Sequence, residues 1–229
     1  MAAAEQSAEA GTAFAALAEE ASVCTRCRLS EGRTQVVFGG GDPHAKLMFV
    51  GEAPGFHEDK QGYPFVGQAG KLLDQLLAGI EFSRDQVYIA NVLKCRPPGN
   101  RDPMSDEIEA CETFLFRQVE LIEPRLIATL GNFATKLLSG KSDGITRVHG
   151  QTQQARIGQR DVTLYPIFHP AAALYTPAML KTLEADFERI PGLLADVPKE
   201  PAVEESTAEA AAVVVASASA GTSEQLGLF

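Results

Sequence analysis

Residues 47–55 read Leu-Met-Phe-Val-Gly-Glu-Ala-Pro-Gly. The first four residues are apolar and predict a short strand that is buried on both faces. The glycines and the proline that follow predict a turn, and this turn carries one carboxylate, Glu52. Open α/β sheets bind their ligands at the carboxyl ends of the strands. The stretch therefore predicts an α/β fold, although an ordinary strand-to-loop turn would show the same pattern.

Three further stretches place distinctive residues in comparable positions. Residues 88–91 read Tyr-Ile-Ala-Asn, and residues 166–170 read Pro-Ile-Phe-His-Pro. Residues 64–67 read Pro-Phe-Val-Gly and lie in a predicted loop that leads into a helix. Asn91 and His169 thus stand where strands should end, as Glu52 does, and we expect these ends to share one edge of the sheet.

The hydrophobic periodicity predicts strands that alternate with helices. We expect strands at residues 46–50, 86–92, 126–130 and 163–168. We expect helices at residues 8–21, 67–80, 106–122, 132–139 and 177–190, with Ser105 as the N-cap of the third. This order predicts an α/β fold with three layers, α/β/α, around a central, mostly parallel four-stranded sheet.

The net charge of −10 at first argues against a nucleic-acid-binding protein. Residues 1–23 contain four glutamates and no lysine or arginine, and residues 195–229 contain six acidic residues and one lysine. Residues 24–194 therefore carry a net charge of only −1. Because phosphate binding depends on local charge, this central part can still present a basic face.

The chain contains no run of about 18 apolar residues and no basic segment followed by an apolar run at its start. We therefore expect a cytoplasmic monomer with no membrane contact.

The four cysteines are Cys24, Cys27, Cys95 and Cys111. Disulfides are unusual in a cytosolic chain, so four cysteines with none to spare favour a metal site. The second pair is separated by fifteen residues, which does not match a zinc site built from two Cys-x-x-Cys knuckles. A [4Fe–4S] cluster fits the spacing. Zinc and unliganded core cysteines remain as alternatives.

These stretches, in this order, resemble the family 4 uracil-DNA glycosylases, the iron–sulfur class of the uracil-DNA glycosylase superfamily. The resemblance covers about residues 20–190 and includes residues 94–98, Lys-Cys-Arg-Pro-Pro. It implies a monofunctional glycosylase of base excision repair, which hydrolyses the N-glycosidic bond of deoxyuridine in DNA and leaves an abasic site. It also implies a structural [4Fe–4S] cluster on Cys24, Cys27, Cys95 and Cys111.

The resemblance assigns the base-binding residues. Asn91 would read the uracil edge, because its amide can accept from N3–H and donate to O4, whereas cytosine presents the opposite pattern. Phe65 would stack on the base. The backbone at Ala53 would contact uracil, and Glu58 would exclude the thymine methyl group by its bulk.

Two further residues would act on the bond that breaks. His169 would donate to uracil O2 and stabilise the leaving group as negative charge develops. Glu52 would position water or support the sugar cation.

Contacts to DNA are expected from five residues. Leu174, in the stretch after His169, would enter the minor groove as a wedge. Arg96 and Arg101 would bind phosphates beside the cluster. Arg147 and His149, in a predicted hairpin, are further phosphate contacts. Family members often have serine after His-Pro, but this chain has Ala171.

The resemblance and the composition divide the chain into four parts. Residues 1–23 form an acidic helical lead, and residues 24–194 form the glycosylase domain. Residues 195–223 are poor in aromatic residues and rich in solvating ones, which predicts a disordered linker. Residues 224–229 end the chain with a peptide that resembles the Gln-Leu-x-Leu-Phe motif by which bacterial proteins bind the sliding clamp. Its contact residues would be Gln225, Leu226, Leu228 and Phe229.

Two other functions compete with this interpretation. Some relatives capture uracil-DNA without turnover, through a basic insertion that contains histidine, and residues 94–98 continue here without such an insertion. A DNA-binding module with a metal site but no activity would leave Glu52, Asn91 and His169 unexplained.

Overall fold

One sheet organises the chain. The computed structural model describes residues 2–196, with side chains from residue 11 onward. In this part, six strands form a single sheet in the order β1-β3-β2-β4-β6-β5. Their bounds are β1 Gly40–Gly41, β2 Leu47–Gly51, β3 Tyr88–Asn91, β4 Leu126–Leu130, β5 Gln153–Ile157 and β6 Arg160–Ile167. Strands β3, β2, β4 and β6 run parallel, which confirms the predicted α/β fold and its parallel centre.

The two edge strands correct the predicted four-stranded sheet to a mixed sheet of six. Strand β1 pairs antiparallel with β3, and β5 pairs antiparallel with β6. Strand β1 consists of two glycines, and β5 alternates exposed and half-buried residues over most of its length. Neither strand contains an apolar run, so their pairing with a neighbour, more than their own sequence, makes them strands.

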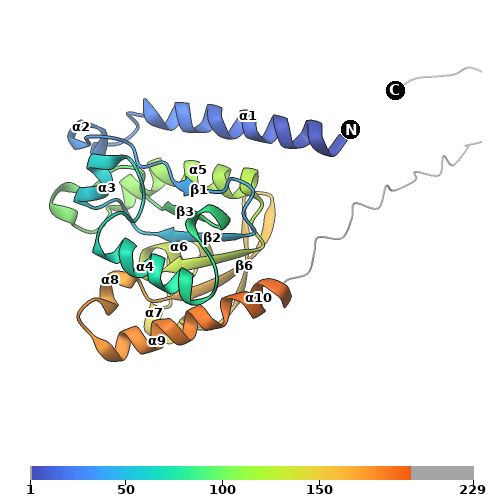
Figure 1. Ribbon diagram of the computed structural model, residues 1–229. Helices are drawn as coiled ribbons and strands as arrows, with labels where there is room; N and C mark the ends of the chain where they lie inside the picture. The colour runs from blue at the N-terminus through green and yellow to red at the C-terminus, as the bar shows by residue number, and fades with distance from the viewer. Residues whose placement is uncertain (1, 197–229) are drawn as a thin grey trace, which may run out of the picture. The chain divides into compact units, whose positions relative to one another are not determined.

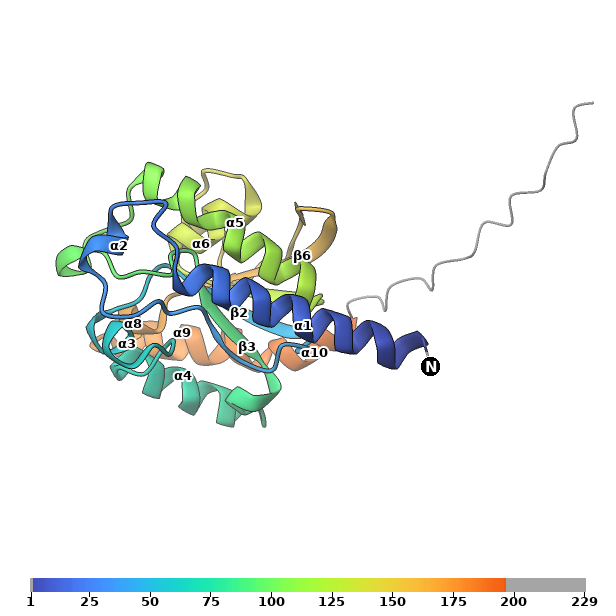
Figure 2. The same cartoon turned by 90° about the horizontal axis from the view of Figure 1, so that it is seen from above.

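Helices cover both faces of the sheet, which gives the three predicted layers. In Figures 1 and 2, α1 and α5 lie on one side of the sheet, and α4, α9 and α10 lie on the other. The described helices are α1 Ala2–Ser22, α2 Leu29–Gly32, α3 Phe56–Gln61, α4 Gln68–Gly79, η1 Arg84–Gln86, η2 Pro98–Asn100, α5 Ser105–Ile122, α6 Asn132–Ser139, α7 Ile145–Val148, α8 Pro170–Ala173, α9 Pro177–Glu188 and α10 Ile190–Asp196.

The apolar core is split in two by the sheet. Successive side chains of a strand point to opposite faces. Met48 and Val50 of β2 therefore join an apolar cluster with residues of α1, α5 and α6. Leu47 and Phe49 join a second cluster with residues of α4, α9 and α10. Burial on both faces explains why the central strands are continuous apolar runs.

Three local predictions were wrong. Helix α1 begins at Ala2 rather than at residue 8, consistent with the alanines among its first residues, since alanine is the best helix former. Ser105 lies inside α5, and the N-cap is Met104, whose N–H donates to Glu107 Oε2 at 3.0 Å. Residues 145–148 form the short helix α7 rather than part of a hairpin.

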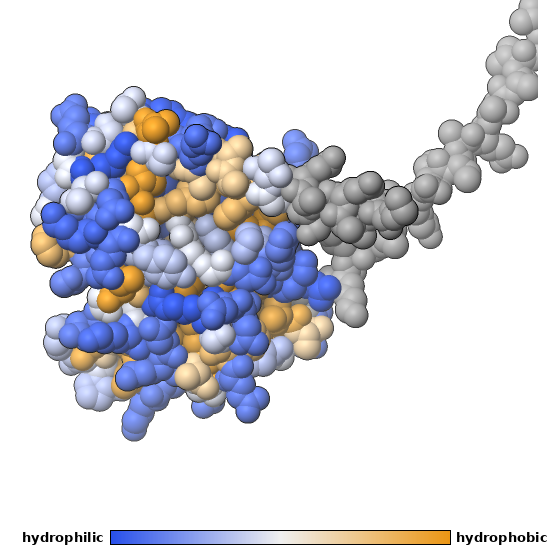
Figure 3. All heavy atoms as spheres, turned by 45° about the horizontal axis from the view of Figure 1, so that its top comes forward, coloured by the Kyte–Doolittle hydropathy of each residue, from blue (hydrophilic) through white to orange (hydrophobic). Residues whose placement is uncertain are grey.

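The described residues contain no helix that is long and apolar enough to cross a membrane. On the face drawn in Figure 3, groups of apolar residues lie among hydrophilic ones. Such a mixed surface is ordinary for a folded protein. The function must therefore be sought in a particular site.

Candidate active site

Parallel pairing brings the ends of β2 and β3 together. Gly51 and Asn91 are partners in the register of these strands. Beyond them, Val92 N donates to Gly51 O at 2.9 Å, and Leu93 N donates to Glu52 O at 3.0 Å. The turn that carries Glu52 is thus fixed against the strand end that carries Asn91.

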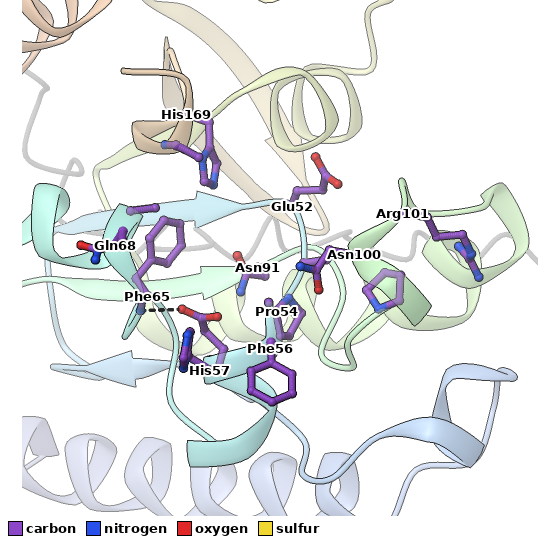
Figure 4. Close-up of a pocket in the computed structure, with 17 residues that line it drawn as sticks. Glu52, Pro54, Phe56, His57, Phe65, Gln68, Asn91, Asn100, Arg101 and His169 are labelled. Carbon is purple, nitrogen blue, oxygen red and sulfur yellow. Dashed lines mark hydrogen bonds between the residues drawn. The ribbon is translucent and has the colours of Figure 1, made fainter. Parts of the chain in front are cut away.

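A cavity of about 570 Å³ opens at this edge of the sheet, a usual size for a small-molecule site. In Figure 4, the side chains of Glu52, Phe65, Asn91 and His169 surround a common space. Of the predicted site residues, the cavity is lined by Glu52, Ala53, Glu58, Phe65, Asn91, Arg101 and His169. The rest of its wall is made by Pro54, Gly55, Phe56, His57, Gly67, Gln68, Ala69, Pro97, Asn100 and Ala171.

Asn91 supplies a buried acceptor to this cavity. Its side chain is 2% exposed, and its Oδ1 atom has no hydrogen-bond partner among the described residues. A buried polar group without a partner costs about 1–3 kcal/mol. Gly51 leaves the room that this amide needs, because a Cβ at position 51 would lie 2.4 Å from Oδ1. A ligand with an N–H group at this point would satisfy the acceptor.

Phe65 is held in an unusual backbone conformation. Its φ of 53° lies in the left-handed region, which residues other than glycine rarely adopt. Its ring is buried and stacks on His169, with ring centroids 5.5 Å apart. Strain of this kind clusters at functional sites, where the surrounding structure imposes it.

Two charged residues impose this conformation. Arg84, in η1, donates to the carbonyl oxygens of Pro64 and Phe65. From the other side, Glu58 Oε1 accepts from the N–H groups of Val66 and Gly67 at 2.9 and 3.0 Å. Glu58 therefore fixes the loop that carries Phe65, in addition to lining the cavity as predicted.

His169 presents a neutral donor to the cavity. Its Nδ1 atom accepts from Ala171 N at 3.1 Å, so the neutral ring carries its proton on Nε2. Desolvation lowers the pKa of His169 to about 4, and the nearby Glu58 opposes this shift only in part. The imidazole is therefore uncharged at neutral pH.

The pKa of Glu52 is shifted in the opposite direction, upward. Desolvation, with a smaller contribution from Asp102, raises the pKa of Glu52 to about 7. A carboxyl group with this pKa is well matched to a general base near neutral pH.

The comparison with known proteins agrees with this geometry. The sequence model of the Uracil DNA glycosylase superfamily matches residues 38–190. The chain belongs to the uracil DNA glycosylase superfamily. It is 49% identical over 177 residues to the type-4 uracil-DNA glycosylase of Sulfurisphaera tokodaii, which covers 75% of this chain and 80% of the relative. The corresponding enzyme of Saccharolobus solfataricus is 44% identical, over 80% of this chain and 87% of the relative. That of Thermotoga maritima is also 44% identical, over 69% and 81%. These relatives confirm the resemblance to the type-4 branch of the superfamily.

The four cysteines lie together, outside the active-site cavity. Cys24, Cys27, Cys95 and Cys111 all line a second, small cavity between the loop after α1 and the start of α5. Within the described part of the chain, no three His, Cys, Asp or Glu side chains are placed to hold a metal ion. The four sulfur-bearing side chains thus share one cavity without forming a single-ion site.

The surroundings of the cysteines suit bound thiolates. Lys94 N donates to Cys111 Sγ at 3.3 Å, and Arg33 Nη1 donates to Cys95 Sγ at 3.5 Å. Burial raises the pKa of the Cys95 thiol, and it raises the pKa of the Cys111 thiol to about 11. Burial thus favours the protonated thiols, whereas the N–H donors from Arg33 and Lys94 act in the opposite direction and would stabilise thiolates.

Lys94 connects the two cavities. Its side chain is 2% exposed, and its Nζ donates to Asn91 O at 2.9 Å and to Gln118 Oε1 at 2.6 Å. Desolvation lowers the pKa of Lys94 to about 8. The short segment from Asn91 to Cys95 therefore carries a buried amide, a buried amine and a buried cysteine.

Two of the predicted phosphate contacts lie beside the active site. Arg96 Nε donates to Asn100 Oδ1 at 2.6 Å, and Asn100 lines the cavity. Arg101 also lines the cavity, but both of its terminal nitrogens are paired with the carboxylate of the buried Glu107. In Figure 4 its side chain lies apart from Glu52, Asn91 and His169.

The remaining predicted DNA contacts are separate from the cavity wall. Arg147 is exposed and pairs with Asp143, four residues earlier. The Nδ1 atom of His149 lies 3.3 Å from Asp186 Oδ2, and its ring packs on Phe168. The structure therefore gives His149 internal partners and does not bring it to the site. Leu174 is half-buried at the end of α8, one residue before the exposed Tyr175.

Sequence patterns did not identify Arg84, Lys94 or Phe56 as functional residues. Arg84 contacts carbonyl groups about twenty residues away along the chain, and Lys94 was noted only as part of the stretch 94–98, without a role of its own. Phe56 directly follows Pro54 and Gly55 of the turn after the first predicted strand, and this position was the one available signal.

Proposed function

We propose that this protein is a base-excision-repair uracil-DNA glycosylase, a hydrolase that releases uracil from DNA and leaves an abasic site. One observation carries the proposal: the same cavity presents a buried acceptor without a partner, Asn91 Oδ1, and a neutral donor, Nε2–H of His169. The type-4 relatives, which are named uracil-DNA glycosylases, support it. The residues of the proposed site all belong to one chain, so we propose that the active unit is a monomer. We also propose that it acts on DNA in the cytoplasm.

Recognition begins with the extrusion of the nucleotide from the stack, because the glycosidic bond cannot be reached inside a duplex. Asn91 Oδ1 then accepts from uracil N3–H, and its amide nitrogen donates to O4. With the amide in this orientation, cytosine would leave the buried acceptor unpaired, at a cost of about 1–3 kcal/mol. Phe65, fixed by Arg84 and Glu58, provides the face on which the base stacks.

Cleavage then uses His169 and Glu52, the two side chains whose pKa values are shifted. The bond between N1 and C1′ breaks, and its electron pair moves into the uracil ring. Nε2–H of His169 donates to O2 as negative charge develops there, and a neutral donor can do this without forming an ion pair. Glu52, in its ionised form, accepts a proton from the water whose oxygen bonds to C1′.

We further propose that Cys24, Cys27, Cys95 and Cys111 hold a [4Fe–4S] cluster. The four cysteines line one small cavity, which supports a single group bound by all four. Such a cluster supplies a structural link and no step of the hydrolysis. The donors from Arg33 and Lys94 support bound thiolates.

The test is a multiple-turnover assay of uracil release from an oligonucleotide with one U:G pair. We expect free uracil from the wild type and losses of about 10²-fold or more for Asn91→Ala and His169→Ala, as for other groups that act in the transition state. His44→Ala is the control for His169→Ala, because His44 does not line the cavity. Wild-type activity in both site variants would refute the assigned roles.

The same assay tests the capture function. A protein that captures uracil-DNA would give a DNA adduct or a tight complex without free base. A denaturing gel run beside the release assay separates these outcomes.

We propose that the C-terminal peptide binds the sliding clamp. Residues 225–229 lie outside the described residues, so this proposal rests on the sequence alone. Leu226, Leu228 and Phe229 would fill an apolar pocket, and the preceding segment would act as a tether that raises the effective concentration. Deletion of residues 225–229 should abolish clamp binding in a titration and leave uracil release from short oligonucleotides unchanged. Clamp binding that survives the deletion would refute the proposal.

A further inference from the structure

We propose that Phe56 stacks on a nucleobase next to the extruded uridine, and that Arg96 and Lys60 bind the adjoining phosphates. The inference rests on the proposed glycosylase function. It assigns to the rim of the cavity a second subsite, for an unpaired neighbouring nucleotide.

The position of Phe56 is unusual for an apolar residue. Its side chain is 49% exposed although it is the first residue of α3. The large apolar side chains exposed in the described part of the chain are Val23, Phe56, Tyr63, Met104 and Tyr175. Of these five, only Phe56 lines the active-site cavity. In Figure 4 its ring lies beyond Pro54 and beside His57, on the side of the cavity away from His169.

Two cations lie against the ring. The guanidinium carbon of Arg96 lies over the Phe56 ring, 5.1 Å from its centroid, and Lys60 Nζ lies over it at 5.9 Å. The ring of His57 meets Phe56 edge-on at 5.5 Å. An aromatic ring with cations in contact with it is the combination that binds single-stranded nucleic acid, in which bases stack on the ring and cations meet the backbone.

Phe56, Arg96 and Lys60 form a platform, and hydrogen bonds to the rest of the protein hold it in place. Asp59, buried in α3, accepts from Thr34 N at 2.8 Å, and Gln35 Nε2 donates to Lys60 O at 2.7 Å. Arg96 is held by Asn100 Oδ1. The helix that carries Phe56 is therefore fixed before DNA binds, so little ordering is needed when a base stacks on it.

Extrusion of the uridine makes a base available to this platform. When one nucleotide leaves the stack, its neighbours lose a stacking partner. Every base has a π-face, so the platform would not select a sequence. It would instead favour substrates whose neighbouring base is already unpaired.

The test combines protein variants with substrates that lack a neighbouring base. We would measure kcat/KM for uracil release from three single-stranded oligonucleotides. One is intact, and the others carry a tetrahydrofuran residue in place of the nucleotide 5′ or 3′ to the uridine. The variants are Phe56→Leu, Phe56→Trp and, as a matched control, Tyr63→Leu, because Tyr63 is exposed outside the cavity wall.

We expect Phe56→Leu to lose about tenfold in kcat/KM on the intact substrate, the effect of one base–aromatic stack. On one of the two substrates without a neighbouring base, Phe56→Leu and the wild type should agree within twofold. Phe56→Trp should retain wild-type activity, and Tyr63→Leu should affect all three substrates alike.

An equal loss for Phe56→Leu on all three substrates would overturn the inference, as would no loss on the intact one. Failure of the wild type to release uracil from any substrate would instead overturn the proposed function.

Discussion

At the residue scale, the cavity acts on two titratable side chains in opposite directions. Desolvation favours the neutral form of each, so the pKa of Glu52 rises to about 7 and the pKa of His169 falls to about 4. His169 thus stays an uncharged donor throughout the neutral range. Of these two side chains, Glu52 is the one that changes its charge near neutral pH.

This difference predicts how the rate depends on pH. Proton acceptance needs the ionised form of Glu52, so single-turnover uracil release should fall as the pH drops through about 7 and level off above it. Glu52→Gln should lower the rate by about 10²–10⁴-fold, the usual contribution of a general base. It should also remove the pH dependence.

Rates measured from pH 5 to pH 9 on wild type and Glu52→Gln test the assignment. A wild-type midpoint near 4.5, the ordinary pKa of a glutamate, would contradict it. So would an unchanged midpoint in the variant.

Two of the proposed site residues could be found in the sequence because they lie where apolar strands end. Asn91 is the last residue of β3 and Glu52 follows the last residue of β2, and the parallel register pairs Asn91 with Gly51. Their protonation could not be found in this way. The pKa of Glu52 depends on Asp102 and on burial, and both follow from the folded path of the chain.

At the scale of elements, the loop that carries Phe65 depends on η1. Arg84 is the residue of η1 that holds this loop, since it donates to two of its carbonyl groups and pairs with Asp74 of α4. Removing this side chain would release the backbone at Phe65 from its left-handed conformation. The stacking face would then become mobile.

Arg84→Met keeps the length of the side chain and removes its donors. We expect a loss of about tenfold in kcat/KM, since each hydrogen bond to a charged group contributes about 1.5–3 kcal/mol. Arg156→Met, on the exposed edge strand β5, is the matched control because its ion pair with Asp161 is solvent-exposed. A variant with normal kcat/KM would show that the loop holds its shape without Arg84.

Helices and strands were predicted correctly where a buried face gives a clear hydrophobic period. They were missed where hydrogen bonds to another part of the chain determine the secondary structure. The helix at 132–139 was predicted with its observed bounds, and the strand at 126–130 likewise. Strand β5 was missed because half of its residues face solvent, and its hydrogen bonds to β6 hold it. The hairpin predicted around His149 was wrong, because Gly144 precedes the helical turn α7 and Asn132 Oδ1 accepts from Ile145 N.

At the scale of the whole domain, the cysteines join segments that are distant in the sequence. Cys24 and Cys27 follow α1, Cys95 follows β3, and Cys111 lies within α5. Helix α1 reaches the same region, where Arg26 lies over the ring of Phe114 and pairs with Glu20. A group bound by all four cysteines would cross-link these segments and stabilise the fold.

If the four cysteines cross-link these segments through a bound group, replacing one cysteine should destabilise the fold. Cys27→Ser should lose bound iron and sulfide and lower the melting temperature by more than about 4 °C, the shift that corresponds to roughly 1 kcal/mol in a domain of this size. Ser30→Ala, which changes a neighbouring hydroxyl in the same cavity, is the control. Iron, zinc and sulfide analysis of the wild type, with melting curves of all three proteins, provides the measurement. Zinc in place of iron, or an unchanged melting temperature, would contradict the cluster.

The short segment from Asn91 to Cys95 also limits how this enzyme can be re-engineered. Asn91 lines the active-site cavity at one end of the segment, Cys95 lines the cysteine cavity at the other, and Lys94 Nζ donates to Asn91 O between them. One inserted residue would displace Lys94 and Cys95 relative to Asn91 and disturb all three positions at once. Libraries that vary loop length should therefore leave residues 91–95 intact and use the β5–β6 turn, residues 158–159, which line neither cavity.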